Sequence, residues 1–269
     1  MKKFIKYMVC LTLVLTAGNA WAWNKMGHEA MAILASERLT PQAQDMVSKI
    51  LPEGDLHTNA YWLNTLKKDN KYAATRHWHH TTLNAQGRST TQNANDGIVQ
   101  LERNIEILRN RQEHSDSLVV AALNTVVHLV GDLHCVAHIR FEDIPHSKGF
   151  GFYRSNGKSM NPKDKKSCPR TSWYKIWSHW YFALHGGFSS EMYANDIKLC
   201  QGDKFNEYAS GTPREWVEDM GREARPLLAR IQPNGVLDST TAFNWELIHE
   251  RCVAKASVRL AVILNDIFK

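Results

Sequence analysis

The sequence predicts an all-α protein, and two kinds of observation support that prediction. Apolar residues recur every three or four positions over long stretches, most clearly over 96–111, which places them on one helical face. Two helices are expected to begin at Thr-Pro pairs, at Thr40 and at Thr212, because threonine caps a helix and proline fits its first turn. No repeat or linker divides the sequence, so we expect a single multi-helix domain.

The expected elements follow one another with short breaks. Residues 72–83 are expected to be irregular or extended, and 84–95 to form a polar loop. Aromatic residues return at helical spacing over 173–184, and we expect this stripe to pack in the core. A small β-hairpin is expected near 149–160, where Asn156-Gly157 is a typical tight-turn pair. The other expected helices span 28–39, 41–51, 59–68, 96–111, 116–131, 213–231 and 241–268.

Residues 1–22 have the three parts of a secretory signal: a basic start, an apolar middle, and the small-x-small end of Ala20 to Ala22. Cleavage after Ala22 would make Trp23 the first residue of a helical domain over 23–269. The apolar part is too short for a comfortable membrane span, so we expect no stable membrane anchor. The protein is therefore expected to be exported and to be periplasmic or secreted.

Charge and cysteine content set only broad limits on function. Removal of the signal, which contains three lysines, lowers the net charge from +6 to +3, and this mild positive balance permits a phosphate-bearing substrate without requiring one. An even number of cysteines follows the signal, which permits two disulfides in an exported protein. None has the close spacing of a cysteine zinc motif, and Cys135 is expected to be a small apolar core residue. These cysteines are Cys135, Cys168, Cys200 and Cys252.

The stretch 124–138 concentrates residues that bind metal ions. It is an apolar run with three histidines and one aspartate. His128 and Asp132 are four apart and would share one face of a helix, and His138 follows six residues later. Imidazole and carboxylate groups on a buried helix are typical zinc ligands. The same pattern also fits a core histidine bonded to a carboxylate, so both interpretations stay open here.

A second stretch begins at Trp23. After cleavage Trp23 would carry a free α-amine, which is partly neutral at neutral pH because such groups titrate near ~8. With its own carbonyl oxygen, this amine can chelate a metal, and His28 lies five residues on. The alternative is an ordinary tryptophan near a chain end.

Together these motifs resemble the zinc-dependent single-strand nucleases and nucleotidases of the nuclease S-one/P-one type, which are relatives of zinc phospholipase C. The resemblance runs the length of the chain after residue 22. The segments that carry it, in the family's order, are Trp23-x4-His28, Trp78-His79, Gly131-Asp132-Leu133-His134 with His138, Trp216-Val217-Glu218-Asp219, and Arg259-Leu260-Ala261 with Leu264-Asn265.

The resemblance implies one α-helical domain of the phospholipase C type with three zinc ions in a cleft. It also implies hydrolysis of phosphate esters by a hydroxide held between two zincs that share a carboxylate. Asp132 and Asn64 would then be the catalytic positions, and His134 would orient a ligand. The ligands implied are His79, His128 and Asp132 for the first zinc, Trp23, His28 and Asp132 for the zinc at the N-terminus, and His138 for the remaining one.

The sequence departs from the family at several of these positions. Asn64 stands where the family has an aspartate ligand, and an amide brings no charge. Tyr174 and Ser178 replace a histidine and an aspartate, and neither normally binds zinc at neutral pH, the phenol titrating near ~10. His80 takes the place of the aromatic residue that stacks a base, and Thr82 replaces an acid that contacts it. We therefore expect one or two zincs.

Two functions remain in contention. The leading interpretation is a monomeric, secreted zinc phosphoesterase of nuclease type that hydrolyses phosphodiester bonds in single-stranded nucleic acid or nucleotides. The alternative is a non-catalytic relative that keeps one or two structural metals and binds a phosphate-bearing ligand. A third interpretation treats the histidines as purely structural. The sequence leaves DNA, RNA, nucleotide and lipid open as substrates.

Overall fold

The computed structural model describes residues 23–51, 54–67, 69–144, 151–155 and 159–269. The predicted signal over 1–22 and the turn pair Asn156-Gly157 lie outside these residues.

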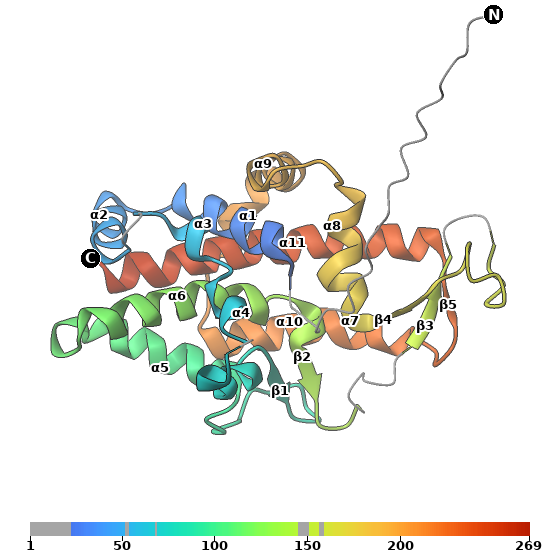
Figure 1. Cartoon of the computed structure of the whole chain (residues 1–269), viewed down its shortest axis with the longest axis horizontal. Helices are drawn as coiled ribbons and strands as arrows, with labels where there is room; N and C mark the ends of the chain where they lie inside the picture. The colour runs from blue at the N-terminus through green and yellow to red at the C-terminus, as the bar shows by residue number, and fades with distance from the viewer. Residues whose placement is uncertain (1–22, 52–53, 68, 145–150, 156–158) are drawn as a thin grey trace, which may run out of the picture.

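Helices dominate the described chain, which confirms the all-α class (Figure 1). The helix predicted over 59–68 is shorter than expected, since within that range α3 ends at Asn59 and α4 covers only Trp62–Leu66. The helices are α1 (Lys25–Ser36), α2 (Pro41–Ile50), α3 (Leu56–Asn59), α4 (Trp62–Leu66), α5 (Gly97–Arg109), α6 (Asp116–Leu133), α7 (Trp173–Lys175), α8 (Tyr181–Leu184), α9 (Ser190–Gln201), α10 (Pro213–Ala229) and α11 (Ser239–Ile267).

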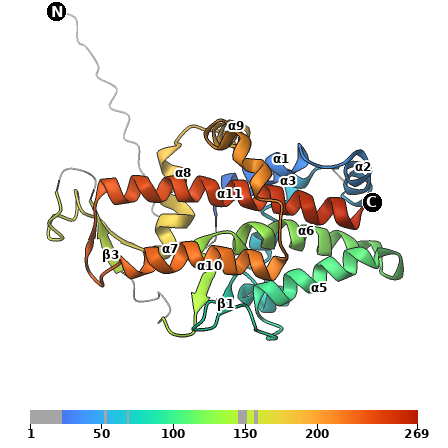
Figure 2. The same cartoon turned by 180° about the vertical axis from the view of Figure 1, so that it is seen from behind.

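Helices α6 and α11 form the centre of the fold, and α1, α5 and α10 pack around them (Figures 1 and 2). Every residue of α6 from Ala122 to Leu133 is buried, as expected of a helix that is apolar on all sides. By length and composition α6 could cross a membrane, but 72% of it is buried inside the protein. It is therefore placed as a core helix.

The β-hairpin expected over 149–160 is wrong, because the strand in this range pairs with strands outside it. Strand β3 (Gly151–Arg154) pairs antiparallel with β4 (Arg170–Ser172) and parallel with β5 (Val236–Leu237). The backbone N–H of Tyr153, for example, donates to the carbonyl of Gly235 at 2.8 Å. Both neighbours of β3 are distant in the sequence, so a local turn signal could not identify them.

A second sheet contains two strands, one before α5 and one after α6 in the sequence. Strand β1 (Thr81–Leu83) pairs parallel with β2 (Ile139–Phe141). Residues 72–83 were expected to be irregular or extended. Only the end of this range forms a strand, because Asn70–His77 forms a 3-10 helix. This sheet places the residues that follow α6 beside the residues that follow Trp78.

Helix α9 was not predicted from the sequence. Ser189 caps it by accepting a hydrogen bond from the N–H of Met192 at 3.2 Å. Its apolar face is narrow, and Met192 and Leu199 are exposed on its other side. Its hydrophobic periodicity is therefore weak.

The aromatic stripe of 173–184 packs in the core, as expected. Trp173, Trp177 and Tyr181 are almost fully buried, and the Trp173 and Trp177 rings lie 5.3 Å apart. The stripe is not a regular α-helix, because Ile176–Trp180 forms a π-helical turn between α7 and α8.

The four cysteines after residue 22 are free thiols, and three of them are buried. The disulfides that the sequence permitted are thus not formed in the described part of the chain. Cys135 is 1% exposed and packs in the apolar core, as expected.

The start of α5 depends on a close backbone approach. A Cβ at Gly97 would lie 2.2 Å from the Trp78 carbonyl oxygen and 2.9 Å from that of His80. The Gly97 N–H also donates to the His80 carbonyl at 2.7 Å. These contacts hold the segment 78–80 against α5, so its position depends on the absence of a side chain at Gly97.

We predict that Gly97→Ala lowers the free energy of unfolding by about 2–3 kcal/mol, because two backbone carbonyls must move. Urea unfolding followed by far-UV circular dichroism measures this. Gly186→Ala is the matched control, because its Cβ would meet only the Ala183 carbonyl oxygen at 3.5 Å. Equal stability of Gly97→Ala and the natural protein would contradict the packing described.

Candidate metal centre

A buried carboxylate, Asp132, lies at the centre of the predicted site. Its Oδ1 is 3.3 Å from Nε2 of His28. Its Oδ2 is 3.2 Å from Nε2 of His128 and 2.5 Å from Nδ1 of His79. All four side chains are essentially inaccessible to solvent. The spacing of His128 and Asp132 along α6 therefore brings both to one face, as the sequence indicated.

His28 reaches this site from α1. Asn24 caps that helix by accepting from the N–H of Gly27 at 3.1 Å. The His28 ring stacks on that of His128, with centroids 4.1 Å apart and planes at 11°. A Cβ at Gly131 would lie only 2.8 Å from Nδ1 of His28, so the absence of a side chain there lets α1 approach α6.

His128 is oriented by a backbone carbonyl. Its Nδ1 donates to the Ala60 carbonyl oxygen at 2.8 Å, which leaves the Nε2 lone pair directed toward Asp132. Histidines that bind metals are commonly oriented in this way. The short helices α3 and α4 thus contribute through Ala60, which lies between them.

Several fully buried polar atoms around Asp132 have no hydrogen-bond partner among the described residues. Buried polar groups normally have partners, so such a concentration indicates a missing ligand. These atoms are both ring nitrogens of His28, Nε2 of His79, His128 and His138, both amide atoms of Asn64, Oδ1 of Asp132 and the Tyr174 hydroxyl. Nitrogen and oxygen donors grouped in this way fit a divalent cation.

The protonation states also suit a cation. Burial lowers the pKa of His28, His79 and His138 to about 4. Burial would raise the pKa of Asp132, but His128 and the other imidazoles hold it well below its usual range. At neutral pH the imidazoles of His28, His79 and His138 are therefore neutral and the carboxylate of Asp132 is ionised, which is the state that binds metals.

Donor atoms of three residues form one compact group at this centre. One donor atom from each of His28, His128 and Asp132 lies within 4.8 Å of the others. The two oxygens of Asp132 also face different partners, Oδ1 toward His28 and Oδ2 toward His128 and His79. A carboxylate that is shared by two cations needs such an arrangement. Two imidazoles with a carboxylate are a typical zinc set.

The other predicted ligand positions lie in or beside this group. Trp23 is fully buried, and its ring centroid is 6.1 Å from that of His28. Asn64 is fully buried on α4. Nδ1 of His138 donates to the carbonyl of His79, which places His138 next to the residues around Asp132. The half-buried ring of His80 lies 4.8 Å from that of His138.

The positions that replace two family ligands are not equivalent. The Tyr174 ring lies 5.5 Å from that of His138, and burial raises the pKa of Tyr174 well above its usual value. Its phenol therefore stays protonated. The Ser178 hydroxyl donates to the Tyr174 carbonyl at 2.8 Å and lies 2.6 Å from Nδ1 of His179. Ser178 is thus already engaged, and His138 lacks two co-ligands.

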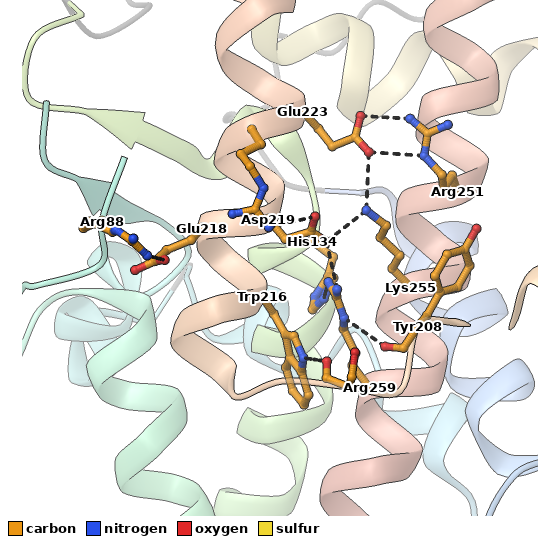
Figure 3. A network of polar contacts seen from close by, with 12 residues as sticks. Arg88, His134, Tyr208, Trp216, Glu218, Asp219, Glu223, Arg251, Lys255 and Arg259 are labelled. Atoms are coloured by element: carbon orange, nitrogen blue, oxygen red, sulfur yellow. Dashed lines mark hydrogen bonds and ion pairs between the residues drawn. The ribbon is translucent and has the colours of Figure 1, made fainter. Parts of the chain in front are cut away.

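His134 does not orient a metal ligand, contrary to expectation. Its Nδ1 donates to the Val130 carbonyl at 2.7 Å, and its Nε2 lies 3.1 Å from Nη1 of Arg259. His134 is the residue that ends α6, where the helix rotation turns its ring away from Asp132. It belongs instead to a network of ion pairs between α10 and α11 (Figure 3).

Within that network, each acidic side chain is paired with a lysine or an arginine. Asp219 accepts from Arg259 at 2.8 Å and from Lys255 at 2.9 Å, and Lys255 also reaches Glu223 at 3.3 Å (Figure 3). Glu223 in turn binds Arg251 at 2.8 Å. Burial opposes ionisation of Asp219, but Lys255 and Arg259 lower its pKa to about 2. These contacts fasten the end of α6 between α10 and α11.

Sequence reasoning missed two half-buried residues beside the centre, Tyr61 and Lys67. The Tyr61 ring lies 5.8 Å from that of His28, and burial together with Asp132 raises the pKa of Tyr61 to about 12. Burial lowers the pKa of Lys67 to about 8, while Asp132 opposes that shift. Lys67 follows Asn64 by three positions, and this helical spacing was the available signal.

Comparison with known families bears on the same region. Residues 23–144 match the family described as S1/P1 Nuclease. The matched segment contains the whole centre around Asp132 and ends before Tyr174 and Ser178. The resemblance to this nuclease family is confirmed over that segment, and nucleases of this kind cleave phosphodiester bonds. No curated protein matches the chain.

We predict that Asp219→Asn lowers the free energy of unfolding by about 3 kcal/mol at pH 7, because two buried cations lose their charged partner. The folded-state pKa of Asp219 is about 2 against 3.8 ordinarily, so its contribution is complete above pH 3.8 and is lost as the pH falls through 2. The difference from the natural protein should therefore shrink between pH 7 and pH 3 in urea unfolding.

Asp45→Asn is the control for this change, since the exposed Asp45–Lys49 pair should contribute less than about 1 kcal/mol. A gap between Asp219→Asn and the natural protein that is constant with pH would contradict the charge-based explanation.

Proposed function

We propose that the protein is an exported, monomeric zinc-dependent phosphoesterase of nuclease type, which acts on single-stranded nucleic acid or nucleotides. One observation carries the proposal. The buried group of His28, His128 and Asp132 offers donor atoms within 4.8 Å of one another, inside the segment that matches a nuclease family.

When bound at such a group, zinc polarises a phosphate oxygen and generates a nucleophile from water at neutral pH. The chain's own residues position the reactants. Asp132 lies near His28 through Oδ1 and near His128 through Oδ2, so each carboxylate oxygen is available to a metal ion. Lys67 is half-buried on the same side of the fold, and its charge interacts with the Asp132 carboxylate. His80 is half-buried at the edge of the group, where its ring is available to stack on a base.

The donor set supports one or two zinc ions. Asn64 contributes an uncharged amide, and the protonated phenol of Tyr174 suits hydrogen-bond donation to a phosphate better than it suits a metal. His138 then has too few co-ligands for a third ion, since zinc usually takes three or four protein ligands.

Export is tied to the metal centre in this proposal. The α-amine of Trp23 can act as a ligand only if the chain begins there, which requires removal of 1–22 after export. The indole ring of Trp23 packs edge-on against the ring of His28, which supports that role.

The alternative function is that of a non-catalytic relative with a structural metal. Complete burial of His28, His128 and Asp132 favours it, because a phosphate must reach the cation in order to be cleaved. The two functions differ in one observable, namely turnover by the metal-loaded protein.

The test of the proposal combines metal content with activity. The purified protein should hold one or two zincs at the Asp132 centre and should release nucleotides from single-stranded DNA or RNA. Asp132→Asn should lose the zinc of this centre and at least about 100-fold of the activity, because it removes the shared charged ligand. Asp116→Asn, at the exposed start of the same helix, should change neither.

Removal of zinc by a chelator and its re-addition provides a second route if Asp132→Asn folds poorly. Activity that disappears and returns with zinc supports the phosphoesterase. One or two bound zincs with no turnover would establish the non-catalytic relative, and a protein without bound zinc would refute both.

We further predict that Asn64→Asp raises zinc affinity by about 10-fold or more, because it restores a charged ligand at a fully buried position. When a chelator has removed the zinc, the same change should lower the free energy of unfolding, since a second uncompensated carboxylate is then buried beside that of Asp132. Calorimetric titration with zinc and thermal melting measure the two effects. Unchanged affinity would mean that Asn64 does not face the metal.

A further inference from the structure

A second group of metal-binding side chains lies where α8, α9 and α11 meet (Figures 1 and 2). His185 follows α8, Asp196 lies on α9, and Glu246 and Glu250 lie one turn apart on α11. Single donor atoms of His185, Asp196 and Glu250 lie within 4.8 Å of one another. Nε2 of His185 is 3.5 Å from Asp196 and 3.8 Å from Glu246.

His185 is held as a ligand would be. Its Nδ1 donates to the Tyr181 carbonyl at 3.0 Å, which leaves Nε2 directed at the carboxylates. Its ring lies 4.8 Å from that of Tyr193 and 5.3 Å from that of Phe188. A backbone carbonyl on one ring nitrogen and free carboxylates near the other is a common arrangement at metal sites.

Among the described residues, no lysine or arginine forms an ion pair with Asp196, Glu246 or Glu250, and His185 is the basic side chain that they face. Glu250 is only 5% exposed, and its Oε2 has no hydrogen-bond partner in the part of the chain that the structure describes. Burial, Asp196 and Glu246 raise the pKa of Glu250 to about 7. Three carboxylates therefore converge on one imidazole, and a buried, unpartnered oxygen among them indicates a cation as the missing partner.

The distances suit zinc. Tetrahedral zinc with bonds of ~2.0–2.2 Å places its ligand atoms roughly 3.3–3.6 Å apart. The 3.5 and 3.8 Å separations at His185 need only small adjustment to reach this range. An imidazole among the donors favours zinc over calcium or magnesium, which prefer oxygen ligands only. Asp196, with a side chain 36% exposed, gives an ion access from solvent.

We propose that His185, Asp196 and Glu250, with Glu246 as the fourth ligand, form a structural zinc site that fastens α8 and α9 to α11. The site is separate from the Asp132 centre and does not depend on the proposed phosphoesterase activity. It accounts for the placement of α9, whose own apolar face is narrow.

The test compares zinc binding and thermal melting of the purified full-length protein and its variants. Glu250→Gln and Asp196→Asn should each bind about one zinc fewer per chain after dialysis against micromolar zinc. Zinc should raise the melting temperature of the natural protein by about 5 °C or more through this site. Both variants should lose this contribution and keep only the rise that zinc at the Asp132 centre produces. Asp203→Asn, an exposed acid after α9, is the matched control and should behave as the natural protein.

Melting in chelator separates a metal site from an ordinary ion-pair cluster. A metal ligand set should leave Glu250→Gln at least as stable as the natural protein without zinc, because one repelling charge is gone. Destabilisation of Glu250→Gln and Asp196→Asn by the same amount with zinc and with chelator would overturn the proposal. Unchanged zinc content in both variants would also overturn it.

The zinc content of the variant Asp132→Asn distinguishes the two centres. The proposed structural zinc should remain in that variant, whatever happens to zinc at the Asp132 centre. If Glu250→Gln does not fold, Asp196→Asn decides the matter, because its side chain lies at the accessible edge. Loss of all zinc binding in Asp132→Asn would contradict a second site.

Discussion

The fold is organised around one buried negative charge, the carboxylate of Asp132. Burying an ionised carboxylate costs several kcal/mol unless a cation or hydrogen bonds compensate for it. Here α1, α6 and the segment after the first 3-10 helix direct His28, His128 and His79 at that one group. Neutral imidazoles can orient a cation but cannot supply the missing positive charge. The electrostatics of the core therefore favour a bound metal ion.

In the ion-pair network between α10 and α11, basic side chains of the protein compensate the charge of a carboxylate. Asp219 is paired with Arg259 and Lys255, and the protein itself provides the positive charges. Around Asp132, by contrast, buried nitrogen and oxygen atoms have no hydrogen-bond partner among the described residues. The contrast separates a stabilising network from a binding site. The group at Glu250 resembles the Asp132 centre in this respect.

The sequence predicted the parts of this structure that depend on local spacing. Helices with a broad apolar face were expected within a few residues of their observed ends, and the spacing of His128 and Asp132 placed them on one face. The partners of β3 and the side chains that face His134 could not be predicted, because they come from remote segments. The group of His185, Asp196 and Glu250 was missed for the same reason, and α9 because its apolar face is narrow.

The central claim is that Asp132 and its imidazoles bind zinc. Diffraction from crystals of the purified protein, measured on both sides of the zinc absorption edge, tests it most directly. The account predicts an anomalous peak within about 2.0–2.2 Å of a nitrogen of His28 or His128 and of an oxygen of Asp132. Crystals grown with zinc that show no anomalous peak beside Asp132 would contradict it.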